Sequence, residues 1–170
     1  MWVRILPGAK LNLQNMLPIS NQDIIIRLLI TFALAGLIGI EREFRRKPAG
    51  LRTNVMVGLG STLMTLASVQ AAGLFQGLPV DPTRIAAQIV TGIGFLGAGT
   101  ILQRGSSNVL GLTTAATLWV VAGIGIAVGF GFYLEAVATT ALVFFTFFVL
   151  SRFVGWLRQK SKFSGEFEET

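Results

Sequence analysis

Apolar residues occur in five long stretches along this chain, separated by short polar connections. Each stretch is about 17–25 residues long, the length that a helix needs to cross the ~30 Å hydrocarbon core of a bilayer. Inside a membrane the backbone must bond to itself, so each stretch predicts a transmembrane α-helix. The first carries Arg27 near its start, and we expect this long side chain to reach the membrane surface. The five predicted helices are Ile24–Ile40, Val55–Ala72, Ile85–Leu102, Thr113–Phe130 and Phe132–Leu150.

Lysine and arginine are distributed unevenly between the two sets of connections. Ten lie in the first and third connections and in the C-terminal tail, and four lie on the other side. Because positive residues stay in the cytoplasm during membrane insertion, the set of ten predicts the cytoplasmic side. The N-terminus is then outside and the C-terminus inside, as an odd number of helices requires. The ten are Arg42, Arg45, Arg46, Lys47, Arg52, Arg104, Arg152, Arg158, Lys160 and Lys162, and the four are Arg4, Lys10, Arg27 and Arg84.

The predicted fold class is therefore an all-α, polytopic integral membrane protein with five transmembrane helices. Residues 1–23 would form an external N-terminal tail, residues 24–150 the five-helix domain, and residues 151–170 a short cytoplasmic tail that is first basic and then acidic. The mean hydropathy of +0.69 and the 13% share of charged residues are typical of a membrane protein. Residues 1–23 contain asparagine, glutamine and two prolines, not the continuous apolar segment of a cleavable signal peptide.

The residue content excludes several classes of function. Cysteine and histidine are absent, so disulfides, thiol nucleophiles, zinc sites and imidazole catalysis are excluded. We therefore predict no enzyme activity, no catalytic or metal-binding residues and no cofactor. The net charge of +6 could suggest nucleic-acid binding. The basic residues lie at the ends of the predicted helices, however, and leave no continuous basic face for a nucleic acid.

The 20 glycines predict close packing between the helices. Membrane helices associate through small residues because the lipid gives them no hydrophobic driving force. Small residues spaced four apart, as in the set Thr31, Ala35 and Gly39, mark the predicted contact faces. The alternative for the third predicted helix is that its glycines let it bend or unwind, so that it lines a site. The predicted packing glycines are Gly39, Gly92, Gly94, Gly97 and Gly123.

Residues 92–97 match the pattern G-x-G-x-x-G, which in dinucleotide-binding folds follows a strand and opens a helix. Here the residues before the match belong to the same apolar stretch, and the next carboxylate along the chain is Glu135. We interpret the match as a consequence of the abundance of glycine.

Three polar segments contain the candidate functional residues, and one of them opens the third predicted helix. Asp81 and Pro82 predict a helix start, because aspartate caps free amides and proline suits the first helical position. Further along, Arg84 and Gln88 lie one turn apart. Together with Asp81 they would form a polar face that points inward, toward a neighbouring helix or an ion.

On the cytoplasmic side, charged residues after the first helix would form an ion-pair network with polar residues that open the second. A solvated loop that only sets the topology is the alternative. Thr113 and Thr114, at the start of the fourth helix, would bond across helices or to carbonyls of their own helix. The residues of the predicted network are Glu41, Arg42, Glu43, Arg52, Thr53 and Asn54.

Together, the three polar segments resemble the MgtC/SapB family of bacterial inner-membrane proteins. They are residues 39–54, 81–99 and 111–119, and the resemblance covers about Ile24 to Leu150. It implies a five-helix protein of the bacterial inner membrane, linked to growth under magnesium limitation and to survival inside host cells. Members of this virulence-associated family are regarded as modulators of other membrane systems. Longer members carry a soluble cytoplasmic domain after the fifth helix, which the resemblance does not reach here.

The positions of the acidic residues bear on magnesium transport. Asp81 and Glu135 are predicted outside and Glu41 and Glu43 inside, so the hydrocarbon core prevents them from forming one Mg²⁺ site. The predicted helices have no acid at the midplane, where transport sites usually lie. We therefore favour a regulator or partner of other membrane transport or energy systems. A small oligomeric channel or carrier for Mg²⁺ or another ion is the alternative. The expected partners are the lipid bilayer and another inner-membrane protein, while a homo-oligomer and bound Mg²⁺ are left open.

Overall fold

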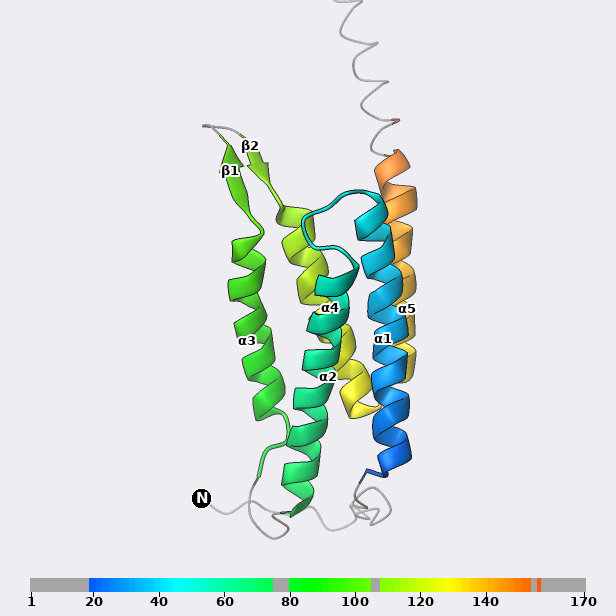
Figure 1. The fold of residues 1–170 in the computed structure, drawn as a ribbon, viewed down its shortest axis with the longest axis vertical. Coiled ribbons are helices and arrows are strands. Elements are labelled where there is room, and N and C mark those ends of the chain that lie inside the picture. The colour runs from blue at the N-terminus through cyan, green and yellow to red at the C-terminus, as the bar shows by residue number, and fades with distance from the viewer. Residues whose placement is uncertain (1–18, 75–79, 105–107, 154–155, 157–170) are drawn as a thin grey trace, which may run out of the picture.

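The structure, a computed structural model, describes residues 19–74, 80–104, 108–153 and 156, which form five helices and one antiparallel pair of strands (Figure 1). The helices are α1 (Asn21–Phe44), α2 (Leu51–Leu74), α3 (Arg84–Gly99), α4 (Leu112–Phe130) and α5 (Tyr133–Phe145), and α5 continues as a π-helical turn, Thr146–Leu150. The strands are β1 (Leu102–Arg104) and β2 (Asn108–Leu110). Most of the two predicted tails lies outside the described residues.

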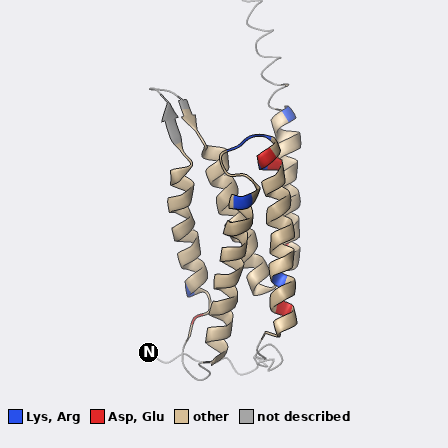
Figure 2. Ribbon diagram, viewed as in Figure 1, with Lys and Arg blue, Asp and Glu red and all other residues tan. Residues whose placement is uncertain are grey.

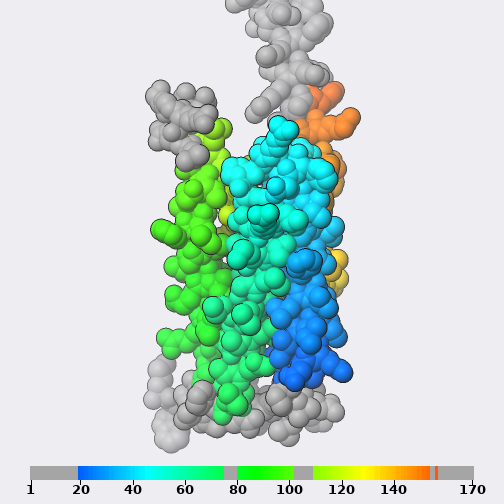
Figure 3. All heavy atoms as spheres, viewed as in Figure 1, coloured from blue at the N-terminus to red at the C-terminus, as the bar shows by residue number. Residues whose placement is uncertain are grey.

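Successive helices run in opposite directions, so the bundle has two ends (Figure 1). We call the end that carries β1 and β2 the hairpin end, and the other the Asp81 end. The two central helices, α2 and α4, each contact both α1 and α3, while α5 contacts α1 and α4. The outer surfaces of α3, α2 and α1 lie side by side in Figure 3.

Local residue chemistry explains where the helices begin and end. The Ser20 hydroxyl accepts a hydrogen bond from the Asp23 amide at 3.1 Å and so caps the start of α1. Gly111 and Gly131 flank α4 with left-handed φ angles of +95° and +89°. At Gly111 a Cβ would lie 1.9 Å from the Thr100 carbonyl oxygen, so the turn from the hairpin into α4 requires glycine.

The described chain is all-α as predicted, apart from this short hairpin, which changes where the third helix ends. The predicted helix Ile85–Leu102 corresponds to α3, but α3 ends at Gly99 and Leu102 pairs with Leu110 across the hairpin. The third helix is therefore 16 residues long, or about 24 Å. Each strand has only three residues, which is too short for a two-residue alternation to be recognised in the sequence.

Four helical segments of the described chain are long and apolar enough to cross a membrane: Asn21–Phe44, Leu51–Leu74, Leu112–Phe130 and Tyr133–Phe153. Large apolar side chains cover the outside of the bundle, with Phe95 84% and Met56 74% exposed. Soluble monomers rarely expose apolar surface so extensively. Most of the described charged residues lie toward the two ends (Figure 2). These features identify a helical membrane protein.

Candidate functional site

A buried ionic cluster lies at the hairpin end, in the last turn of α1. Glu41 and Arg42 are only 6% and 3% exposed. Arg42 Nε donates a hydrogen bond to Glu41 Oε2 at 2.6 Å, and Arg45 Nε lies 2.6 Å from Glu41 Oε1. One carboxylate thus balances two guanidinium groups. Because removing one partner of a buried ion pair leaves an uncompensated charge, Glu41 is expected to be essential to this cluster.

Two aromatic rings of the π-helical turn pack on the cluster. The guanidinium carbon of Arg42 lies 3.9 Å from the centroid of the Phe147 ring, and that of Arg45 lies 5.3 Å from the Phe148 ring. Arg42 Nη1 is buried without a hydrogen-bond partner among the described residues. The ion pair with Glu41 and the cation–π contact therefore share the stabilisation of this buried charge. Single π-helical turns occur frequently at functional sites, which draws attention to this end of α5.

Three contacts fix the shape of the connection between α1 and α2. Asn54 is fully buried and donates its amide group to the carbonyl oxygens of Ala49 and Gly50 at 3.0 Å and 2.8 Å. The Glu43 carboxylate accepts a hydrogen bond from the Leu51 amide at 3.0 Å. Ala49 is itself 2% exposed and packs into the bundle. The connection is therefore a rigid part of the structure.

The predicted ion-pair network differs from the observed one in its basic partner. Arg45 pairs with Glu41, whereas Arg52 and Thr53 are exposed and form no ion pair with another described residue. Arg45 could have been found from the sequence, because it lies four residues after Glu41 and residues four apart on a helix are neighbours. Phe147 had no such signal, since it comes from a helix about a hundred residues away along the chain.

A chain of hydroxyl groups crosses the core from α1 to α4. Thr31 Oγ1 lies 2.7 Å from Thr62 Oγ1, which in turn lies 2.9 Å from the carbonyl oxygen of Gly125 and donates to it. A threonine hydroxyl has one proton, so Thr31 must be the donor in the first of these bonds. Both threonines are fully buried. Each such bond between membrane helices contributes about 0.6 kcal/mol.

Glycines allow the helix backbones to approach closely around this chain. A Cβ on Gly125 would lie 2.5 Å from the Gly58 carbonyl oxygen and 2.8 Å from Ser61 Cβ. A Cβ on Gly39 would lie 2.7 Å from Leu51 Cα. Gly39 thus packs α1 against α2, and the contact between α2 and α4 leaves no space for a side chain.

The other predicted packing glycines have different surroundings. A Cβ at Gly92, Gly94 or Gly123 would meet no atom of the described residues within 4 Å, which corrects the expectation that these three pack the bundle. At Gly97, which is buried, it would lie at an ordinary contact distance of 3.5 Å from Ala115 Cβ. Residues 92–97 lie within the continuous helix α3, so the alternative of an unwound segment is also wrong. The residues directly before the G-x-G-x-x-G match belong to the same helix and not to a strand.

The Arg27 side chain bonds to the end of a neighbouring helix. Its Nη1 donates a hydrogen bond to the Gly129 carbonyl oxygen at 2.6 Å. Gly129 is in the last turn of α4, where the free carbonyls carry partial negative charge. Arg27 therefore caps the C-terminal end of α4. Nothing in the sequence indicated this charge-assisted hydrogen bond, and the expectation that Arg27 reaches the membrane surface stays a prediction.

Asp81 caps a turn that precedes α3. Its Oδ1 accepts hydrogen bonds from the Thr83 hydroxyl at 2.6 Å and from the Thr83 amide at 2.8 Å. The hydroxyl bond first, and the amide bond second, hold the pKa of Asp81 below its usual value of 3.8. Since α3 begins only at Arg84, the prediction that Asp81 caps the helix itself is wrong by one turn.

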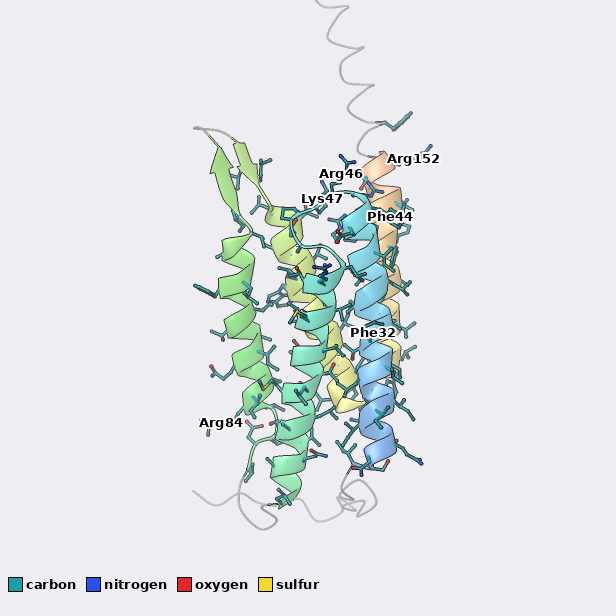
Figure 4. The ribbon with its side chains drawn as sticks, in the orientation of Figure 1. Phe32, Phe44, Arg46, Lys47, Arg84 and Arg152 are labelled. Carbon is teal, nitrogen blue, oxygen red and sulfur yellow. The ribbon has the colours of Figure 1, made fainter. Side chains whose placement is uncertain are left out.

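The predicted inward polar face on α3 is not formed within one chain. Asp81, Arg84 and Gln88 are all exposed, and the buried residue of this turn is Ala86. The side chain of Arg84 points away from the bundle in Figure 4. The small and apolar side of α3 packs against α4, which leaves the polar side facing outward.

At the start of α4 the predicted hydroxyl bonds are displaced by one turn. Thr114 is buried and Thr113 is exposed. The hydroxyl that donates is that of Thr117, to the Thr113 carbonyl oxygen at 2.7 Å. No hydroxyl bond of Thr113 or Thr114 to another described residue is formed, which corrects their predicted role.

The chain is similar to several known proteins over most of its length. Protein SapB of Bacillus subtilis is 40% identical over 143 residues, which cover 82% of this chain and 60% of that protein. Protein MgtC of Salmonella typhimurium is 49% identical over 119 residues, 70% of this chain and 48% of that protein. A protein of Escherichia coli named "Putative magnesium transporter YhiD" is 49% identical over 114 residues, 65% of this chain and 53% of that protein.

The chain thus spans about half to three fifths of the length of these relatives. No solved structure is significantly similar to it. The pattern of the MgtC family matches residues 28–156, which contain the ionic cluster, the hydroxyl chain and all five helices except the start of α1. The chain belongs to the MgtC family.

Proposed function

We propose that this protein is a membrane-embedded regulator or partner of another inner-membrane transport or energy system, and that it acts during growth under magnesium limitation. It would be neither an enzyme nor a cofactor-binding protein. The observation that carries the proposal is the closed centre of the bundle. The backbones of α2 and α4 meet at Gly58 and Gly125, and the nearby Thr31 and Thr62 hydroxyls bond to each other. At this level the described parts of α1, α2 and α4 are in direct contact with one another.

At least three of the five carboxylates in the described residues are already engaged within the fold, which supports this proposal. Glu41 is paired with two arginines, Glu43 accepts a hydrogen bond from a backbone amide, and Asp81 accepts two from Thr83. Mg²⁺ is usually bound through one or two carboxylates together with several waters. Glu41 and Asp81 lie at opposite ends of the bundle, and in the part of the chain that the structure describes no three acidic residues cluster as a metal site.

The link to magnesium comes from the relatives. One is named as a putative magnesium transporter, and the chain belongs to the MgtC family. Because the chain spans only part of these relatives, the activity of a whole relative is carried over as a proposal. The preference for a regulator over a transporter rests on the close packing of α1, α2 and α4 described above.

We also propose that all five helices cross the inner membrane of a bacterium, with the hairpin end in the cytoplasm. At the hairpin end the described part of the chain carries seven basic residues, whereas the Asp81 end carries Arg27 and Arg84. The seven are Arg42, Arg45, Arg46, Lys47, Arg52, Arg104 and Arg152. Since the chain has no cysteine, single Lys47→Cys and Arg84→Cys variants in intact spheroplasts test this orientation. A membrane-impermeant maleimide should label only the Arg84→Cys variant, and the reverse labelling would overturn it.

A channel or carrier built from several copies is the second candidate. The exposed polar side of α3, with Arg84 and Gln88 on a mostly apolar helix, favours it. Several copies could bring such polar sides together, because polar groups inside a membrane require partners.

Uptake of Mg²⁺ into proteoliposomes, followed with an enclosed dye, decides between the two candidates. For a regulator we expect the uptake to equal that of empty vesicles, with correct insertion checked by the cysteine labelling above. Saturable uptake that is lost in an Asp81→Ala variant would establish a channel or carrier.

The partner protein is sought in cells with a photo-crosslinking residue at Lys47, and with the same residue at Arg84 as the matched control. A membrane protein captured only from Lys47 is the expected result.

A further inference from the structure

Basic side chains at the hairpin end outnumber the acidic groups available to them. Both described carboxylates of this end are already engaged, Glu41 by two arginines and Glu43 by the Leu51 amide. Four further basic residues are exposed and form no ion pair with another described residue. They are Arg46, Lys47, Arg52 and Arg152. Figure 4 shows three of them, together with Phe44, at the same end of the bundle.

Arg46 has a backbone conformation that disfavours an arginine. Its φ is +52°, the only positive φ of a non-glycine residue among the described residues. It follows the end of α1, and its amide bonds to the Glu43 carbonyl oxygen at 2.9 Å. Glycine is the usual residue at such a helix end, because a Cβ is unfavourable in the left-handed region. An arginine at a strained position indicates that its side chain has a role outside the fold.

The positions of these cations match the surface of a membrane. Arg152 is in the last turn of the candidate span Tyr133–Phe153. Phe44 is 85% exposed and Phe153 is 56% exposed, and aromatic side chains collect at the boundary between headgroups and acyl chains. Because Ala49 and Asn54 fix the connection between α1 and α2, the cations at residues 46–47 are held at this level.

We propose that Arg46, Lys47, Arg52 and Arg152 form a binding surface for the phosphate groups of anionic phospholipids in the adjoining leaflet. Phosphate oxygens accept hydrogen bonds and are negatively charged. They would therefore supply the acidic partner that these guanidinium and ammonium groups do not have among the described residues. The exposed Phe44 ring lies at the acyl boundary beside them. Each basic residue near an anionic membrane strengthens binding about fivefold.

Native mass spectrometry of the purified protein tests this proposal. The protein in neutral detergent is offered equal amounts of phosphatidylglycerol and phosphatidylcholine, and the retained lipids are counted. We expect retention of phosphatidylglycerol in preference to phosphatidylcholine, and a decrease in that preference of about fivefold in Arg46→Gln. Arg84→Gln neutralises an exposed arginine at the Asp81 end that forms no ion pair with another described residue, and should leave the preference unchanged.

Arg46→Gly separates lipid binding from folding. Glycine suits a φ of +52°, so the melting temperature should be unchanged or higher while the preference for phosphatidylglycerol falls as in Arg46→Gln. Arg46→Lys should retain the preference, because it keeps the charge. Equal preference in wild type and Arg46→Gln would overturn the proposal, as would an equal loss in Arg84→Gln. If the wild-type protein showed no lipid preference but captured an acidic protein through these four basic residues, the surface would be assigned to a protein partner instead.

Discussion

Helices α1 and α3 have similar sequence patterns and opposite surroundings. In each, an arginine near the start is followed by polar or small residues four and eight positions later. The positions are Arg27, Thr31 and Ala35 in α1, and Arg84, Gln88 and Gly92 in α3. In α1 the arginine is half-buried and the other two are fully buried, whereas in α3 all three are exposed. The helical period thus defines a face, but only a neighbouring helix decides whether that face is inside.

The largest effect is expected from filling the contact between α2 and α4. Gly125→Leu would place a side chain where Gly58 and Ser61 already lie, so it should lower the free energy of unfolding by more than about 3 kcal/mol and reduce the yield of folded protein. Gly94→Leu on α3 is the matched control, because a Cβ there meets nothing described within 4 Å. Size-exclusion profiles and melting temperatures in detergent measure both. A Gly94→Leu variant as disrupted as Gly125→Leu would show that α3 packs against another molecule.

The next effect concerns the acidic residues at the two ends of the bundle. Glu41→Gln removes the carboxylate that balances Arg42 and Arg45, and should destabilise the fold by about 3–5 kcal/mol. Asp81→Asn, at an exposed turn, should leave the melting temperature nearly unchanged. Thermal unfolding in the same detergent compares the two. Equal decreases in melting temperature for Glu41→Gln and Asp81→Asn would contradict the distinction between a buried and an exposed carboxylate.

The two arginines provide a smaller contrast. Arg27→Ala removes the charge-assisted hydrogen bond to Gly129 and should cost about 1.5–3 kcal/mol. Arg84→Ala removes an exposed side chain without an ion pair among the described residues, so we expect little change. Chemical denaturation in mixed micelles measures both free energies. If the loss in Arg27→Ala were no larger than that in Arg84→Ala, Arg27 would not act as a cap of α4.

The smallest effect is a change in protonation at Asp81. Thr83→Ala removes the hydroxyl bond that lowers the pKa of Asp81, so this pKa should rise toward 3.8. Because the lowered pKa favours the ionised form in the fold, its stabilisation is present above about pH 3.8 and is lost as the pH falls through the folded-state pKa. Carbon-13 NMR of labelled aspartate measures the pKa of Asp81. Asp23, the one other aspartate in the chain, serves as the internal reference. An unchanged pKa in Thr83→Ala would assign the shift to another group.

The sequence predicted the helices better than their contacts. The apolar stretches correspond to α1 to α5, because the length and hydropathy of a stretch are local properties. The spacing of Thr31, Ala35 and Gly39 also identified the face of α1 that is buried. The hairpin at residues 102–110 was missed, because three-residue strands follow directly on an apolar helix and show no separate period.

The candidate site could be predicted only in part, for a related reason. Glu41 and Arg42 were found because charged residues at the end of an apolar helix stand out. Arg45 was missed although it lies four residues from Glu41, and Phe147 could not be found because its contact depends on how α5 packs against α1. Glycines on different faces of the helices look alike in a sequence, so Gly94 was predicted to pack and Gly58 was not.

The sequence by itself determined that this protein is a bundle of apolar helices with its charges toward the ends, and that it is a member of the MgtC family. These are properties of single segments, and the bilayer acts on each segment according to its length and polarity. The tertiary structure alone decided that Arg27 caps α4, that Glu41 is buried between two arginines, and that α3 faces outward with its polar side. Each of these depends on which faces of two distant segments meet, and that is set by close packing across the whole bundle.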